Sequence, residues 1–436
     1  MKKSIVLCIC AVLAMSCGSR TAVQPSVVSE PAPYAVYAEG LIGSVKPQGW
    51  LKEYLERQRT GLSGHPDAMC YPYNTCLWAG DIARERGKHG SDWWRYEQTA
   101  YYSDGLIRLG YLLDDEQMYG RVEDGIHYSL AKVDSLGIFG SRWHVEDGDD
   151  RYHVWPQAVF FRAIQAYYEA TGDESILPSL ENHFLGMPVS MLGSSRNAIN
   201  IEGTLWTYAH TGNEALLQHA VDAWNHGDFW LHDPERLTEP VLVQHGVTAC
   251  EQLKLPVILY AYTGDRSYLD LALALQKRIE DENMLPDGVP SSAEYFSGKT
   301  ANHSHETCDI ADYSWTLGYF LMATGEARWG DGIERAVFNA GPGACGKDFR
   351  TIQYFSSVNQ FNCTGHSNNN EFMHGRTWME YRPVHQTECC VGNVHRIMPN
   401  YVARMWMTAG KDELVSALYG PSEVSIALSD GSVCTV

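Results

Sequence analysis

Four apolar segments of this 436-residue sequence end in the same way, on a Thr-Gly pair followed by a polar residue. The motifs are Thr171-Gly172-Asp173, Thr211-Gly212-Asn213, Thr263-Gly264-Asp265 and Thr324-Gly325-Glu326. Glycine readily takes the left-handed conformation that closes a helix, and the polar residue after it can begin the next helix. Apolar residues recur at helical spacing around these motifs, so the sequence predicts helical hairpins in series.

The Thr-Gly pairs recur at intervals of 40, 52 and 61 residues, which decides between two helical architectures. A tetratricopeptide superhelix has a tight period of about 34 residues, and these intervals are looser. Hairpins whose inner helices face one another can instead close into a ring. We therefore expect a mainly α fold, an (α/α)6 toroid over residues 41–413, with the substrate in the mouth where the long inter-helix loops gather.

The last part of the sequence has a different pattern. Val424, Ile426 and Leu428 alternate with polar residues, and Asp430-Gly431 predicts a hairpin turn. A lone hairpin exposes unpaired edges. Residues 414–436 are therefore interpreted as the truncated start of a C-terminal β-sandwich domain, and the alternative is that they pair with residues near 34–44.

The amino terminus has the features of an export signal. Two lysines precede an apolar run from Ile5 to Met15 that is too short for a permanent membrane span. The end of this run resembles a bacterial lipoprotein cleavage box, which predicts a signal over residues 1–17, a lipid on Cys17 and a tether over residues 18–40. Ordinary secretory cleavage is the alternative. We expect an exported bacterial lipoprotein, periplasmic or outer-membrane associated, that meets the membrane only through this lipid.

The charge balance excludes one class of partner. Acidic side chains number 53 and basic ones 33, giving a formal net charge of −20. This charge repels phosphate backbones, and no Lys/Arg stripe opposes it. We expect no nucleic-acid partner.

The cysteines point to a metal. Nine remain beyond Cys17, an odd number for an exported protein, and adjacent Cys389 and Cys390 would make a strained disulfide with each other. Zinc takes thiolate, imidazole and carboxylate ligands in sets of four. A Glu306-x-Cys308 pair with Cys389-Cys390 would complete such a set, although His303 and His305 could equally ligate and buried thiols without a metal remain an alternative.

At these residues the sequence resembles glycoside hydrolase family 127, the β-L-arabinofuranosidase family. The resemblance rests on the Glu-Thr-Cys segment at 306–308, the Cys-Cys-x-x-Asn-x-x-Arg segment at 389–396, the opening Gly43 to Leu51 and the Thr-Gly-Asp hairpins. It implies a helical toroid followed by β-sandwich domains. It also implies a zinc ion held by Glu306, Cys308, Cys389 and Cys390, with Cys389 as nucleophile and Glu294 as general acid/base.

The resemblance also implies a substrate, a plant cell-wall oligosaccharide or polysaccharide from which L-arabinofuranose or a related sugar is released. Asn197 and Asn200 lie in the segment where the family's sugar-gripping histidines would be sought, which implies a changed sugar. Asn393 and Arg396 are expected to support the Cys-Cys turn. Candidate pocket residues, each with a structural role as the alternative, are His153, Trp155, His245, Tyr354 and His385.

Two other functions fit a helical ring rich in aromatic residues. An unsaturated-uronide hydrolase or polysaccharide lyase would use Asp, His or Tyr and leave Cys389 dispensable. A non-catalytic glycan-binding surface lipoprotein would need no nucleophile at all.

Overall fold

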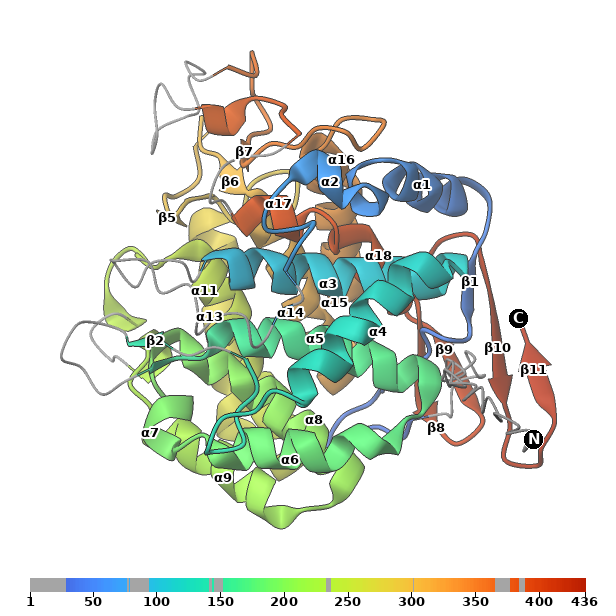
Figure 1. Ribbon diagram of the computed structural model, residues 1–436. Coiled ribbons are helices and arrows are strands. Elements are labelled where there is room, and N and C mark those ends of the chain that lie inside the picture. The colour runs from blue at the N-terminus through green and yellow to red at the C-terminus, as the bar shows by residue number, and fades with distance from the viewer. Residues whose placement is uncertain are drawn as a thin grey trace, which may run out of the picture.

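The computed structural model describes most of the chain as a mainly helical ring (Figure 1). The described residues are 29–76, 78, 94–140, 143–144, 152–232, 237–300, 302–364, 377–383 and 389–436. The predicted signal, residue Cys17 and the tether up to residue 28 lie outside them. The prediction of a mainly α toroid with β structure at its carboxyl end is confirmed.

The helices and strands of the described residues have the following bounds. The helices are α1 Gly49–Thr60, α2 Pro66–Met69, α3 Trp94–Leu113, α4 Glu116–Leu130, α5 Trp155–Thr171, α6 Leu177–Gly186, α7 Val189–Leu192, α8 Ile201–Thr211, α9 Glu214–Asn225, α11 Gly246–Gln252, α12 Lys254–Thr263, α13 Arg266–Asn283, α14 Thr307–Thr324, α15 Ala327–Arg335, α16 Gly341–Gly343, α17 Cys389–Asn393 and α18 Ile397–Ala403. The strands are β1 Val45–Pro47, β2 Trp143–His144, β3 Tyr152–His153, β4 Ser292–Ala293, β5 Tyr295–Phe296, β6 His305–Glu306, β7 Phe355–Ser356, β8 Trp406–Gly410, β9 Glu413–Ser416, β10 Ser422–Ala427 and β11 Val433–Thr435.

Six inner segments close the ring. Each packs on the next in the order α3, α5, α8, α12, α14 and α17–α18, and α17–α18 packs back on α3. Outer helices cover them, with α4 against α3, α9 against α8, α13 against α12 and α15 against α14. Because the connections run back outside the ring, the inner helices all start at one mouth and end at the other.

The Thr-Gly motifs end inner helices as predicted. Gly172, Gly212, Gly264 and Gly325 have left-handed φ values of 67°, 67°, 73° and 68°. The threonine before each glycine accepts a hydrogen bond from the backbone N–H two residues later, at 3.2–3.3 Å. Asp173, Asn213 and Asp265 then accept a backbone N–H of the next helical segment. The motif therefore reverses the chain at the mouth where inner helices end.

The carboxyl-terminal strands pair with the beginning of the described chain. Strand β10 pairs with β1, with Val45 opposite Val424, and β11 completes a three-stranded antiparallel sheet through the predicted turn at Gly431. Strands β8 and β9 form a hairpin, and Ala38 bridges Thr408. Pairing with the amino-terminal segment, one of the two alternatives, is therefore present. The domain boundaries at 41 and 414 stay predictions.

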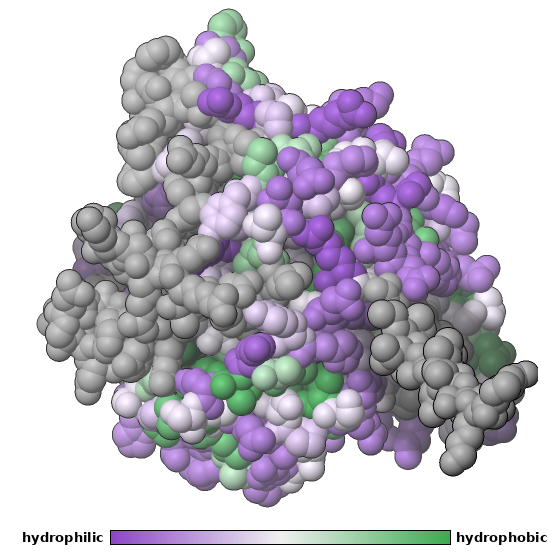
Figure 2. Space-filling view, viewed as in Figure 1, coloured by the Kyte–Doolittle hydropathy of each residue, from purple (hydrophilic) through white to green (hydrophobic). Residues whose placement is uncertain are grey.

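The described surface is polar in some parts and apolar in others. In the space-filling view the described surface over α1 is mainly hydrophilic (Figure 2). None of the described helices combines the length and the apolar character needed to cross a bilayer.

A candidate metal and catalytic centre

Three thiols and a carboxylate meet at the mouth where the inner helices start. The ligand atoms of Glu306, Cys308, Cys389 and Cys390 all lie within 4.8 Å of one another. The Cys308 sulfur is 3.0 Å from that of Cys389 and 3.1 Å from that of Cys390, and Cys389 Sγ is 3.8 Å from Glu306 Oε2. The described cysteines form no disulfide. The structure thus brings together the four residues singled out in the sequence, from segments about 80 positions apart.

Short local elements explain this convergence. Strand β6 pairs with β7, with Glu306 opposite Phe355, and holds the carboxylate at the start of α14. Cys308 lies in the first turn of α14, and Cys389 and Cys390 begin α17. Helices α14 and α17 pack against each other, so their first turns face the same space.

The electrostatics of the cluster favour a bound cation. Burial, Glu294 and Cys389 raise the pKa of Glu306 well above its usual value. Burial and the neighbouring thiols raise the pKa of Cys308, whereas hydrogen bonds from Cys308 and Cys390 lower that of Cys389. Glu306 Oε1 is buried and has no hydrogen-bond partner among the described residues. A positive ion would satisfy this oxygen and stabilise the crowded acids, so the residues fit a metal.

The thiol cluster is held by hydrogen bonds from Asn393, which Arg396 positions in turn, as expected. Asn393 Nδ2 donates to Cys308 Sγ at 3.0 Å, and Arg396 Nε donates to Asn393 Oδ1 at 2.6 Å. Arg396 also donates to Asp312 Oδ2 at 2.6 Å. The thiols are therefore linked to a buried layer of ion pairs inside the ring.

Glu294 lies beside the thiols on the tight turn between β4 and β5. Its φ of 69° is left-handed, unusual for a glutamate. Tyr354 donates its hydroxyl to Glu294 Oε1 at 2.5 Å, and His245 Nε2 lies 3.3 Å from Oε2. The same Tyr354 hydroxyl is 3.6 Å from Cys389 Sγ. One phenol thus connects the candidate acid/base to the candidate nucleophile.

The other predicted pocket residues have different positions. Trp155 is buried at the start of α5, with the Arg196 guanidinium 3.8 Å from its ring centroid. His153 is half-buried in β3, opposite Trp143 of β2. His385 lies outside the described residues.

Asn197 and Asn200 need a correction, because both are buried and bonded to backbone. Asn197 Oδ1 accepts from the Val154 N–H at 2.8 Å, and Asn200 Nδ2 donates to the Val154 carbonyl at 3.0 Å. These amides hold the chain at the start of α5. They are therefore not replacements for sugar-binding histidines.

Sequence reasoning missed a polar cluster next to the thiols. Arg196 donates to Glu251 Oε2 at 2.7 Å and to the Tyr101 hydroxyl at 2.9 Å, and lies 3.6 Å from Glu97. Burial and Cys389 raise the pKa of Glu97, and Arg196 contributes to the lowered pKa of Cys389. No sequence motif or regular spacing identifies these residues, because they come from separate helical hairpins.

Comparison with known proteins agrees with this site. The profile of the β-L-arabinofuranosidase GH127 catalytic domain matches residues 152–403. Comparison with the sequences of curated proteins finds no match.

The solved structures that are similar to this chain include three glycoside hydrolases. One is a glycoside hydrolase with a TM-score of 0.70 and 14% identity, covering 94% of this chain and 68% of that one. A GH127 β-arabinofuranosidase gives 0.67 and 14%, covering 92% and 67%. The GH127 β-L-arabinofuranosidase Ara127N-Se from Geobacillus stearothermophilus T6 gives 0.69 and 16%, covering 90% and 69%. At these identities the likeness shows the fold, whereas the family profile spans more than half of the chain. The protein therefore belongs to glycoside hydrolase family 127, the β-L-arabinofuranosidase family.

Proposed function

We propose that this glycoside hydrolase is a retaining enzyme with Cys389 as nucleophile and Glu294 as general acid/base. Its proposed substrates are plant cell-wall glycans, from which it releases L-arabinofuranose or a related sugar. The observation that carries the proposal is the shared contact with Tyr354. The two contacts of its hydroxyl limit the separation of Cys389 Sγ and the Glu294 carboxylate to about 6 Å. Retaining glycosidases hold their two catalytic groups about 5–5.5 Å apart.

We propose zinc as the ion of the thiol cluster, held by Glu306, Cys308, Cys389 and Cys390. Three thiolates and one carboxylate are a soft, four-donor set typical of zinc. When bound there, zinc would keep the thiols ionised near neutral pH.

The residues of this chain then divide two chemical steps between them. The Cys389 thiolate attacks the anomeric carbon as the glycosidic C–O bond breaks, and Glu294 gives its proton to the leaving oxygen. In the second step Glu294 takes a proton from water, the water oxygen attacks the anomeric carbon, and the C–S bond breaks. Two displacements at one carbon retain its configuration. Tyr354 and His245 hold the Glu294 carboxylate in place through both steps.

The decisive experiment replaces the proposed nucleophile. Cys389→Ala is expected to lower the turnover of aryl β-L-arabinofuranosides and cell-wall oligosaccharides by at least about 10³-fold without unfolding the protein. Cys345→Ala is the matched control, because this buried thiol contacts Tyr54, outside the site. Retained turnover in Cys389→Ala would favour a uronide hydrolase or lyase. A wild type that binds glycans without cleaving them would favour a binding lipoprotein.

Zinc is tested separately by removal. The purified wild type is expected to contain about one zinc per chain, and chelation should abolish hydrolysis and lower the melting temperature, since metal-binding energy adds to folding energy. Added zinc should restore both. A metal-free protein with full activity would contradict the zinc proposal.

We also propose that the protein is an exported lipoprotein anchored through Cys17. This proposal rests on the sequence of residues 1–17. Labelling of cells with a radioactive fatty acid should mark the wild-type chain, and Cys17→Ser should remove the label.

A further inference from the structure

Three apolar side chains lie exposed beside the candidate acid/base Glu294. Tyr295, Val241 and Val243 have 53%, 55% and 54% of their surface open to solvent. Single exposed apolar residues are common on proteins, whereas apolar residues that gather beside a site indicate a binding surface. We call Val241, Val243 and Tyr295 the rim patch.

The backbone places the rim patch on one face. Tyr295 forms an antiparallel bridge with His245, and two backbone hydrogen bonds of 2.8 and 2.9 Å flank the bridge. In such a pair the side chain two positions along, here Val243, lies diagonally opposite on the same face, about 7–8 Å away. Leu242 is buried, so the exposed Val241 and Val243 point away from it on the same side.

The rim patch adjoins the acid/base and lies away from the thiols. The Tyr295 ring meets the His245 ring edge-on with centroids 5.8 Å apart, and His245 Nε2 lies 3.3 Å from Glu294 Oε2. Cys389 lies beyond the Tyr354 hydroxyl, which contacts both catalytic groups. The leaving oxygen departs opposite the attacking sulfur and takes its proton from Glu294. The group attached to that oxygen therefore lies on the side of Glu294 where Tyr295 is exposed.

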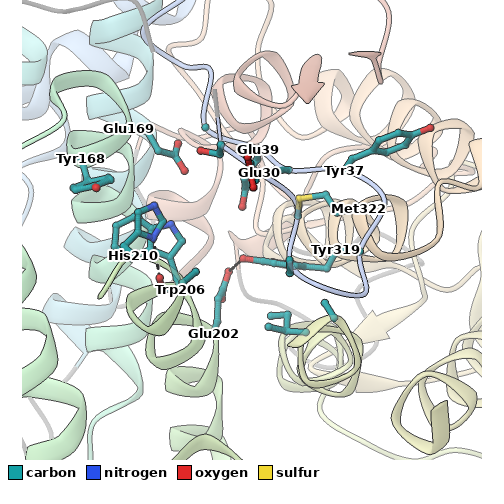
Figure 3. A pocket seen from close by; sticks show the side chains of 18 of the residues that line it. Glu30, Tyr37, Glu39, Tyr168, Glu169, Glu202, Trp206, His210, Tyr319 and Met322 are labelled. Carbon is teal, nitrogen blue, oxygen red and sulfur yellow. Dashed lines mark hydrogen bonds between the residues drawn. The ribbon is translucent and has the colours of Figure 1, made fainter. Parts of the chain in front are cut away.

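A large cavity of the described residues lies elsewhere. It has a volume of about 720 Å³ and lies at the far mouth, where the inner helices end; Glu202 in its wall accepts a hydrogen bond from Tyr319 at 2.8 Å (Figure 3). Its described lining includes neither the thiols nor Glu294. A leaving group extends directly from Glu294, so it contacts the surface around this residue instead of the cavity.

We propose that the rim patch binds the leaving group of the substrate, and that this group is a second sugar unit. The C–H face of that sugar packs on the Tyr295 ring, and Val241 and Val243 contact its edge. This inference rests on the proposed function, because it needs Glu294 as the proton donor. Binding energy from a part of the substrate that does not react can lower the barrier of the reaction. The rim patch therefore favours glycans over glycosides with a small leaving group.

The test compares two substrates of the full chain, a β-L-arabinofuranosyl disaccharide and methyl β-L-arabinofuranoside, whose leaving group is too small to cover the rim patch. Both leaving oxygens need a proton, so a displaced Glu294 would slow both reactions. Tyr295→Ala should lower kcat/KM for the disaccharide about tenfold, and at least about fivefold more than for the methyl glycoside. Tyr295→Phe keeps the ring and should keep at least about half of the disaccharide value.

Tyr419→Ala is the matched control. It removes a tyrosine that is 69% exposed and lies between β9 and β10, and it should leave kcat/KM for both substrates unchanged. If Tyr295→Ala does not fold, as judged by circular dichroism, Val243→Ser replaces it, with an expected loss of about threefold for the disaccharide.

Three results would overturn the inference and leave the proposed function intact. They are an equal loss for the two substrates in Tyr295→Ala, which would assign the ring to packing on His245, an unchanged disaccharide value in Tyr295→Ala or its replacement, and a loss in Tyr295→Phe as large as in Tyr295→Ala. A wild type that cleaves neither substrate would instead contradict the proposed function, and this inference with it.

Discussion

The two mouths of the toroid are built from opposite ends of the same helices. At the catalytic mouth the first turn of the 18-residue helix α14 carries Cys308, and its positive end stabilises thiolate charge. At the other mouth α14 ends before Gly325, and nearby carboxylates already have basic partners: Arg404 pairs with Glu39 at 2.5 Å, and Lys254 pairs with Glu202 at 3.1 Å. The same parallel helices thus present a carboxylate oxygen of Glu306 without a described partner at one mouth and paired carboxylates toward the other.

A buried layer of ion pairs lies between the two mouths. Arg162 contacts Glu202 at 3.4 Å and Asp312 at 3.1 Å, and Arg396 contacts Asp312 at 2.6 Å. Lys254 lies 3.1 Å from Glu202. These side chains come from different inner segments, so the layer connects the segments across the centre of the ring.

The largest expected effect is on hydrolysis, at the mouth where the thiols and Glu294 lie. Glu294→Gln should lower the hydrolysis of unactivated glycosides by about 10²–10⁴-fold, because the leaving oxygen loses its proton donor. Substrates with nitrophenyl leaving groups should lose much less in the first step. An equal loss of rate for all leaving groups would contradict the role of Glu294 as proton donor. The mouth that holds the thiols would then have no assigned general acid/base.

The ion-pair layer should affect both mouths through stability. Asp312→Ala removes the buried carboxylate shared by Arg396 and Arg162 and leaves excess positive charge in the layer, which should lower the free energy of unfolding by about 3–5 kcal/mol. Urea denaturation measures this. Asp331→Ala, an exposed acid on α15, is the control and should change stability by less than about 0.5 kcal/mol. Equal changes in the free energy of unfolding of the two variants would mean that the ion-pair layer contributes little to stability.

A smaller effect is expected for Tyr354→Phe. Loss of the hydroxyl removes a hydrogen bond from Glu294 and a contact to Cys389, which should reduce kcat about tenfold, or about 1.4 kcal/mol. An unchanged kcat would assign Tyr354 a packing role against Trp378, on which it stacks at 4.3 Å.

The smallest effect concerns the helix ends of the far mouth. Gly172→Ala should lower the free energy of unfolding by about 1 kcal/mol, because the new side chain meets no atom within 4 Å and only the left-handed backbone resists it. Gly343→Ala is the matched control, since its added carbon also meets open space but its backbone is helical. Equal melting temperatures for the two variants would contradict this account of the Thr-Gly motif.

Local chemistry was the part of this molecule that the sequence could predict. The Thr-Gly motifs specify helix ends within a few residues. The Glu306-x-Cys308 and Cys389-Cys390 pairs mark the candidate metal site, because the members of each pair are close in the sequence. The cluster around Arg196 and the layer around Asp312 could not be predicted, because their members face each other only after the ring closes. The roles of Asn197 and Asn200 were misjudged for the same reason, since their partner is the backbone of Val154.

The pairing of β1 with β10 has a consequence for how the chain is made. Residues 45–47 are synthesised before the helices of the ring, and their partners at 422–424 are synthesised after them. Strand β1 therefore has no partner until all of those helices have left the ribosome. Pairing across so long a stretch of chain makes closure of this sheet a late step of folding, after the helical hairpins have formed from local contacts.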